Sequence, residues 1–254
     1  MRVATFFIGL VFSALIAFSQ PLRVGMELSY PPFEMTDAEG NPAGVSVEIA
    51  EALGEYLDRP VRIVNIPFQG LIPALRTGKI DLVLSSMTRT EERARAIDFS
   101  NPYLTTGLTL LVGNDSGIDS INDLSDGKVV AVKQGTTGHL YATQNLPGVR
   151  LLVLEKESVA VLEVVQGKAD AFIYDQMSTF KNWQRHQETT NALLDPFRKE
   201  YWAIGVRKGN KALLEEVNRF LAYYEETGGF ERLGDRYLAE QKEAFAKMGY
   251  PFVF

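Results

Sequence analysis

Three side chains able to hold a small anion lie close together in the segment 85–100. Ser86, Thr88 and Arg93 follow the short apolar run 81–84, where backbone amides, hydroxyls and a guanidinium can converge on one group. Arginine suits a carboxylate because its planar fork donates two parallel, charge-assisted hydrogen bonds, which lysine cannot do. Spacing alone leaves two interpretations open: a carboxylate-binding site, or a short solvated helix whose arginines balance the charges of Glu91 and Glu92.

A second pair of hydroxyls follows another apolar run. Thr136 and Thr137 come after Gly135, just beyond the run 129–133, and open a predicted helix. The free amides at the start of a helix attract anions, and threonine hydroxyls add further donors. A Gly-Thr-Thr sequence is more often a plain N-cap. If the segment binds a ligand, it offers a second contact to the carboxylate.

An acidic residue and two aromatic rings could bind the ammonium group and the aliphatic part of a zwitterionic ligand. Asp175 directly follows the apolar run 169–174, so its carboxylate could pair with an ammonium group or simply cap the next helix. Tyr30 and Phe68 could pack on the aliphatic part of a ligand or belong to the core. Opposite charges at Arg93 and Asp175 favour a zwitterion.

Signals for catalysis or for metal and cofactor binding are weak. The chain has no cysteine, and its two histidines, His139 and His186, have neither metal-ligand spacing nor a nucleophile motif beside them. Glycine patterns for nucleotides are missing as well. We therefore expect no catalytic residue, no metal and no cofactor. The formal net charge of -6 disfavours nucleic acid as a partner.

The elements that must position these residues alternate along the chain. Apolar residues at three- and four-residue spacing predict helices over 45–56 and 213–224. Alternation of strands with such helices predicts an α/β fold with mostly parallel sheets, in which ligands bind beyond the carboxyl ends of the strands. The predicted strands are 23–27, 61–66, 81–84, 107–112, 128–133, 151–154, 169–174 and 202–206.

The first residues have the pattern of a secretory signal peptide. Met1 and Arg2 precede an uncharged apolar run over 3–18, and small residues precede a predicted cut after Ser19. An uncleaved membrane anchor is the alternative. Without cysteine there is no site for an N-terminal lipid, so residues 1–19 predict a soluble protein of the periplasm.

Six motifs in order resemble one protein family. Across about residues 22–240 the chain closely resembles the amino-acid-binding members of the periplasmic solute-binding proteins of ABC importers, family 3. The motifs are Tyr-Pro-Pro-Phe-Glu at 30–34, Gly-Val-Ser-Val-Glu-Ile-Ala at 44–50, Gly-Leu-Ile-Pro-Ala-Leu at 70–75, Ser-Met-Thr at 86–88 with Glu-Arg at 92–93, Ile-Asp-Phe-Ser-Asn-Pro-Tyr at 97–103 and Val-Lys-Gln-Gly-Thr-Thr at 132–137.

The resemblance implies a two-lobed type II periplasmic binding fold joined by a two-crossing hinge. Lobe 1 would comprise residues 20–104 and 203–254, and lobe 2 residues 105–202. A family member of this kind is a monomer that closes over an amino acid and delivers it to a membrane permease. The segment 241–254 continues past the usual end of the family and should pack on lobe 1.

The resemblance also assigns the site. Arg93, Thr88 and the backbone at Ser86, next to Met87, would hold the ligand carboxylate together with Thr136 and Thr137. Asp175 would hold the ammonium with help from Ser86 and Thr88. Tyr30 and Phe68 would pack on both sides of the ligand side chain. Glu27, Lys133 and Tyr174 would determine which side chain is accepted. Lys133 opposes a cationic ligand and resembles the glutamine-binding members, whereas Glu27 could accept from an amide or attract a cation. Glutamine is the leading expectation, and arginine or another basic amino acid is the alternative.

Two other functions occur on similar folds. Cyclohexadienyl dehydratases resemble the same family but carry a glutamate three residues after the aspartate that matches Asp175, and here that residue is Ser178. Receptor sensor modules need a downstream membrane span, and nothing apolar of that length follows in the sequence. We therefore expect a binding protein rather than an enzyme.

Overall fold

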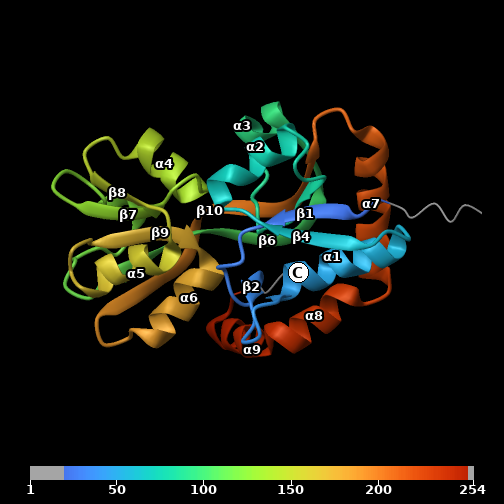
Figure 1. Ribbon diagram of the computed structural model, residues 1–254. Helices are drawn as coiled ribbons and strands as arrows, with labels where there is room; N and C mark the ends of the chain where they lie inside the picture. The colour runs from blue at the N-terminus through green and yellow to red at the C-terminus, as the bar shows by residue number, and fades with distance from the viewer. Residues whose placement is uncertain (1–19, 251–254) are drawn as a thin grey trace, which may run out of the picture.

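A single mixed sheet organises the part of the chain that the structure describes. The structure is a computed structural model and describes residues 20–250, so the predicted signal peptide lies outside the described residues. The strands of the sheet follow the order β4-β1-β5-β10-β6-β9-β7-β8 (Figure 1). Their bounds are β1 Leu22–Met26, β4 Val61–Asn65, β5 Leu82–Val83, β6 Ile97–Gly113, β7 Val129–Lys133, β8 Arg150–Leu154, β9 Ala171–Asp175 and β10 Thr190–Arg207; β2 Met35–Thr36 and β3 Pro42–Ala43 form a separate hairpin.

Two long antiparallel strands, β6 and β10, run through the middle of the sheet. They separate β4, β1 and β5, here called the first half, from β9, β7 and β8, called the second half. The runs predicted at 107–112 and 202–206 are only parts of these strands. Polar residues and Pro102 interrupt the apolar pattern elsewhere, and the pairing of β6 with β10 shifts register at Trp202 and Ala203. Because of these interruptions, the apolar periodicity predicts only part of each strand.

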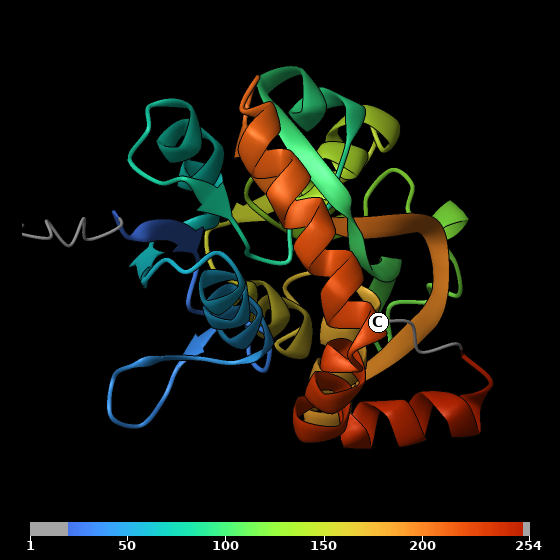
Figure 2. The same ribbon diagram turned by 90° about the vertical axis from the view of Figure 1, so that its right-hand side faces the viewer.

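Helices cover both faces of the sheet. Parallel pairing of β1 with β4 and β5, and of β7 with β8 and β9, confirms the predicted α/β class. The long helix α7 lies beside β6 (Figure 2). The helices are α1 Val45–Tyr56, α2 Leu71–Arg76, α3 Glu91–Ala96, α4 Thr137–Asn145, α5 Glu157–Val165, α6 Gln176–Arg185, α7 Lys211–Glu226, α8 Gly229–Tyr237 and α9 Ala239–Met248, with short 3-10 turns at Phe68–Gly70 and Ile121–Asp123.

Each half has buried clusters of its own. In the first half, Val24 of β1 and Leu53 of α1 pack with Phe220 of α7. In the second half, Val130 of β7 packs with Ile173 of β9. These strands are covered on both faces, which explains why they read as continuous apolar runs.

The C-terminal helix α9 packs on α8 and α6. The ring of Phe245 meets that of Phe180 in α6 edge-on, with centroids 5.2 Å apart. Helix α6 follows β9 directly, yet Met177 and Phe180 are buried with the core cluster of the first half. The tail therefore lies against both α6 and α8 (Figure 1).

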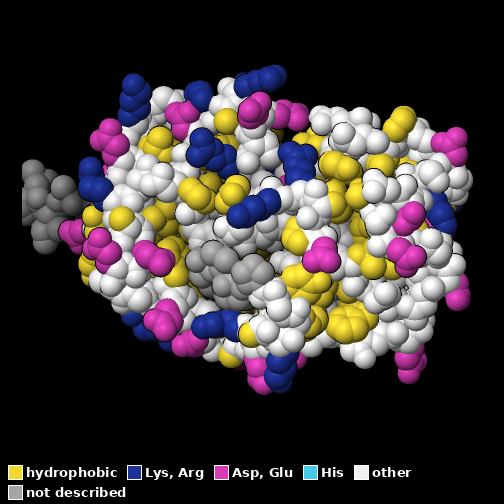
Figure 3. All heavy atoms as spheres, turned by 180° about the vertical axis from the view of Figure 1, so that it is seen from behind, with side chains coloured by type: hydrophobic (Ala, Val, Ile, Leu, Met, Phe, Trp, Pro, Cys, Tyr) yellow, Lys and Arg dark blue, Asp and Glu magenta, His cyan; other side chains and the backbone are white. Residues whose placement is uncertain are grey.

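The surface carries charges of both signs. On the face opposite that of Figure 1, lysines and arginines are interspersed with acidic side chains and scattered apolar ones (Figure 3). Among residues 20–250, no helix is long and apolar enough to span a membrane.

Candidate ligand-binding site

A cleft opens where the two halves face each other across the crossing strands. It brings together eleven of the twelve residues predicted for the site, all except Met87. Leu108, Glu34, Ser85, Glu200 and Trp202 line it as well. The predicted residues in it are Glu27, Tyr30, Phe68, Ser86, Thr88, Arg93, Lys133, Thr136, Thr137, Tyr174 and Asp175.

Parallel strand ends position most of these side chains. Glu27 follows β1, Thr88 follows β5, Lys133 ends β7 and Asp175 ends β9. Because the carboxyl ends of parallel strands meet at one edge of a sheet, residues far apart in the chain converge there. The cleft thus lies where the alternation of elements predicts it.

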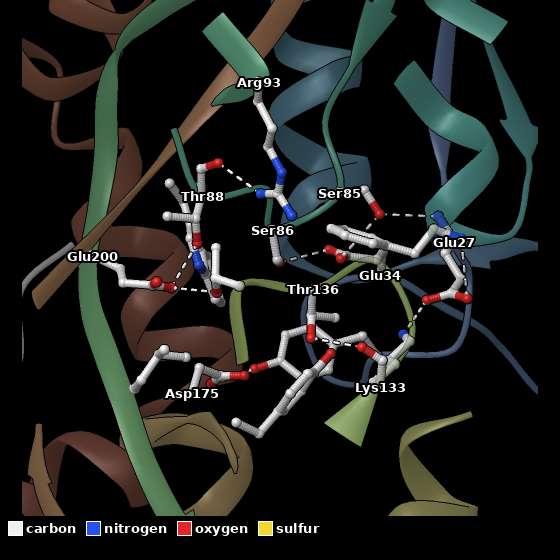
Figure 4. A pocket seen from close by; sticks show the side chains of 16 residues that line it. Glu27, Glu34, Ser85, Ser86, Thr88, Arg93, Lys133, Thr136, Asp175 and Glu200 are labelled. Carbon is white, nitrogen blue, oxygen red and sulfur yellow. Dashed lines mark hydrogen bonds and ion pairs between the residues drawn. The ribbon is translucent and has the colours of Figure 1, made fainter. Parts of the chain in front are cut away.

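Arg93 is buried, so it does not belong to a solvated helix face. Its side chain is 7% exposed, whereas Arg95 of the same short helix is exposed. The guanidinium donates from Nη1 to the carbonyl oxygen of Thr88 at 2.7 Å (Figure 4). It also donates from Nη2 to the carbonyl oxygen of Gly135, in the second half, at 3.0 Å. Burial lowers the pKa of Arg93 to about 10, which still leaves it charged at neutral pH.

Asp175 caps a helix and faces the cleft at the same time. One carboxylate oxygen, Oδ1, accepts from the hydroxyl of Tyr30 at 2.7 Å and from the backbone N–H of Ser178 at 3.1 Å. Burial raises the pKa of Asp175 to about 7. A cation beside this carboxylate would lower that pKa again, because an opposite charge favours the ionised form.

Glu27 and Lys133 form an ion pair across the cleft. The side chain of Lys133 is only 2% exposed. Glu27 also accepts from the backbone N–H of Phe68 at 3.2 Å, and the ammonium of Lys133 lies 5.6 Å from the centre of the Phe68 ring. A buried donor and a buried acceptor therefore stand side by side next to an aromatic wall.

Glu34 lies beneath the cleft and was not among the predicted residues. Its carboxylate accepts from the hydroxyls of Ser46 at 2.7 Å, Ser86 at 3.1 Å and Ser85 at 3.4 Å. Burial raises the pKa of Glu34 to about 8. The residue closes the motif at 30–34, so that motif contained a signal for it.

Glu200 and Trp202 enter the cleft from the crossing strand β10. Oε2 of Glu200 accepts from the hydroxyls of Thr88 and Thr137, both at 2.9 Å. The ring of Trp202 meets that of Tyr30 edge-on, with centroids 6.1 Å apart. No motif marked either residue as part of a site. The charged stretch around Glu200 was not predicted to be a strand, and Trp202 was predicted only as the first residue of one.

Met87 lies in the core and not in the cleft. It is 1% exposed and packs in a cluster with Leu71 and Ile97. Ser86 and Thr88 on either side of it line the cleft, and the backbone of Ser86 is left-handed, with φ 47°, so this segment is not a regular strand. Among the described residues, no group of acidic or histidine side chains could hold a metal ion.

Comparison with known proteins identifies the family of the chain. The chain matches the model of the bacterial extracellular solute-binding proteins, family 3, over residues 22–240. The L-arginine-binding protein of Pseudomonas aeruginosa is 31% identical over 232 residues, which cover 88% of this chain and 90% of that protein.

Solved structures of similar proteins extend the match to the fold. An ancestral amino-acid-binding protein, AncCDT-1, described as a precursor of cyclohexadienyl dehydratase, is 35% identical with a TM-score of 0.78 and covers 85% of this chain and 95% of its own. An ancestral arginine-binding protein bound to arginine is 33% identical with a TM-score of 0.81, covering 87% and 99%. One bound to glutamine is 33% identical with a TM-score of 0.77, covering 86% and 97%. The chain therefore belongs to the family 3 bacterial extracellular solute-binding proteins.

Proposed function

We propose that this protein captures a free amino acid outside the cytoplasm, in the periplasm, and delivers it as a monomer to the permease of an ABC importer. The observation that carries the proposal is that Arg93 and Asp175, two side chains of opposite charge, line the same cleft. Both are buried, they have opposite charge, and they come from opposite halves of the sheet. An amino acid supplies the matching carboxylate and ammonium, whereas a ligand that lacks either group leaves a buried charge unpaired at a cost of several kcal/mol.

The two halves of the sheet correspond to two lobes in this proposal. Lobe 1 comprises residues 20–104 and 203–254, and lobe 2 comprises residues 105–202. The register shifts in the pairing of β6 with β10 at Trp202 and Ala203 fall beside these boundaries. Irregular pairing weakens the ladder locally, which supports a hinge at this point.

For the ligand side chain, glutamine is the leading candidate. A carboxamide presents an acceptor oxygen and a donor NH2 side by side. Lys133 and Glu27 present the complementary donor and acceptor side by side in the cleft. Lys133 also places a buried positive charge where a cationic side chain would have to end.

Arginine is the second candidate, and two observations favour it. Similar proteins include the arginine-binding protein of Pseudomonas aeruginosa and an ancestral protein bound to arginine. The cleft also contains more acidic than basic side chains. Apart from Glu34, which burial keeps protonated at neutral pH, it is lined by Glu27, Asp175 and Glu200, against the two cations Arg93 and Lys133.

A binding function is favoured over a dehydratase. The position that should carry a glutamate as general acid is Ser178, which is buried and donates its hydroxyl hydrogen to Glu157 at 2.5 Å. Ser178 is not among the residues that line the cleft. Turnover of prephenate in a coupled assay would overturn this part of the proposal.

A thermal-shift screen of the twenty amino acids tests the proposal. A ligand at 100 times its dissociation constant stabilises a protein by about 2.7 kcal/mol, which is a clear rise in melting temperature. We expect the largest rise with glutamine, and a largest rise with arginine would select the second candidate. A screen in which no amino acid raises the melting temperature would contradict the proposed function.

A further inference from the structure

Glu200 occupies an unusual position between the two halves of the site. Glu200 lies on the crossing strand β10 and is 3% exposed, and its carboxylate lines the cleft. Oε2 accepts one hydroxyl from each side: Thr88 follows β5 of the first half, and Thr137 begins α4 of the second half. Figure 4 shows the contact between Thr88 and this carboxylate.

The second oxygen of Glu200 lacks a hydrogen bond. Oε1 is buried without a hydrogen-bond partner among the described residues. Its charged neighbours are Arg198 on the same strand, whose half-exposed side chain places Nε 3.9 Å away, and Arg93 on α3. The carboxylate therefore depends on the two threonine hydroxyls for its hydrogen bonds.

A hydroxyl group has a single hydrogen to donate. Because Thr88 and Thr137 direct theirs to Glu200, the sides of their oxygens that face the cleft can only accept. If either hydroxyl turned to donate to a ligand carboxylate, Glu200 would lose half of its hydrogen bonds while remaining buried, which is costly. Neither hydroxyl is then available as a donor to the ligand.

We propose that Glu200 is a positioning residue of the site: it holds the hydroxyl hydrogens of Thr88 and Thr137, so that the Thr88 oxygen accepts from the ammonium group of the bound amino acid. This inference rests on the proposed function. It also changes the part played by Thr137, which must contact the ligand carboxylate through its backbone N–H at the start of α4 and not through its hydroxyl.

A double-mutant cycle tests this role. The variants are Glu200→Met, which removes the acceptor at similar length, Thr88→Val, which removes the hydroxyl at similar volume, and the combination of both. The probe is L-glutamine, or L-arginine if the screen selects it, with affinity measured by calorimetry. We expect each single variant to weaken binding about tenfold, or about 1.4 kcal/mol, and the double variant to bind no more weakly than the weaker single one.

Conservative variants separate positioning from general structural support. Glu200→Gln should stay within about threefold of the wild type, because its carboxamide oxygen can accept both hydroxyls in place of Oε2. Thr137→Val keeps the backbone N–H that contacts the ligand carboxylate, so it should weaken binding less than Thr88→Val does, since the Thr137 hydroxyl does not contact the ligand in this scheme. These two variants and Thr88→Val decide the question even if Glu200→Met does not fold.

Three results would overturn the inference. They are additive losses in the cycle, an unchanged affinity in Glu200→Met, or a larger loss from Thr137→Val than from Thr88→Val. A failure of the proposed function looks different, because the wild-type protein itself would then bind no amino acid.

Discussion

The ammonium of Lys133 is paired with the carboxylate of Glu27, which lies 106 positions earlier in the chain and on the other half of the sheet. Both groups are largely buried, with side chains 2% and 14% exposed. Removing one partner of a buried pair leaves the other without compensation, a loss that typically costs several kcal/mol. The ion pair at this end of the cleft therefore forms only when the two halves lie as they do in this structure.

Replacing Lys133 should change ligand preference more than it reduces binding. Lys133→Gln leaves the carboxylate of Glu27 without its cation, so we expect the ranking of ligands to move toward arginine and lysine by about tenfold or more. Competition calorimetry with glutamine and arginine measures the ratio. Lys168→Gln, at an exposed position in the second half, is the matched control. An unchanged ratio in Lys133→Gln would refute a role in specificity.

Truncation of Arg93 should abolish binding without unfolding the protein. Arg93→Ala removes the buried cation that faces the ligand carboxylate, and losing such a partner typically costs about 2 to 5 kcal/mol, or at least about thirtyfold in affinity. Calorimetry measures the affinity, and circular dichroism checks the fold. Arg95→Ala removes an exposed arginine from the same helix and should bind normally. Equal affinities for the two variants would contradict the site assignment.

Ligand affinity should rise with pH because of Asp175. Its pKa is raised by burial to about 7, and only the ionised form attracts an ammonium group. Wild-type affinity should therefore be roughly tenfold weaker at one pH unit below that pKa than on its plateau above it. Asp175→Asn can still cap α6, so it should fold, bind weakly and lack this rise. The same pH profile in both proteins would show that another group controls binding.

Stability without ligand should fall with rising pH because of Glu34. Its pKa is raised by burial from 4.5 to about 8, so between these values the folded state holds a proton that the unfolded state has lost. The stabilising effect is complete below the unfolded pKa and is lost as pH rises toward 8, by up to about 1.4 kcal/mol per pH unit. Asp175 acts in the same direction.

Glu34→Gln removes this titration while keeping an acceptor for the serine hydroxyls. Urea unfolding between pH 5 and pH 8 should show a flatter profile than in the wild type, by a few kcal/mol over the range. Glu39→Gln, in an exposed turn, is the control and should keep the wild-type slope. A wild-type slope in Glu34→Gln would mean that Glu34 is ionised in the folded protein.

The contact between α9 and α6 should contribute to stability. Phe245 is 1% exposed and meets Phe180 at 5.2 Å, so Phe245→Ala should cost about 3 kcal/mol or more of unfolding free energy. Met248→Ala, at a position 39% exposed on the same helix, should cost far less. Urea unfolding measures both. Equal and small losses would mean that the tail is loosely attached.

The fold and most of the cleft could be predicted from the sequence, for physical reasons. Buried parallel strands read as short apolar runs, and the ligand-facing polar residues follow directly after them, as Thr88 and Asp175 do. Family motifs then fixed which of these strand ends share one site. Arg93 was ambiguous from spacing alone, and its burial decides between the two interpretations.

Other residues could not be placed because their roles depend on tertiary contacts. Glu200 stands in a charged stretch whose strand character comes from pairing with β6 and not from its own pattern. Met87 shared a motif with two cleft residues, and only its tertiary packing with Leu71 and Ile97 shows that it lies in the core. The charge state of Glu34 follows from burial, which a sequence does not display.

The chain carries only two tryptophans, Trp183 and Trp202. Trp202 is 2% exposed in the wall of the cleft, beside the irregular pairing of the crossing strands, while Trp183 lies on α6 at 6.0 Å from the Phe180 ring. If the protein works as proposed, ligand entry and hinge bending would both change the surroundings of the Trp202 indole. Intrinsic fluorescence of the unlabelled protein should therefore follow capture and release in real time, and Trp183→Phe would leave Trp202 as the single reporter.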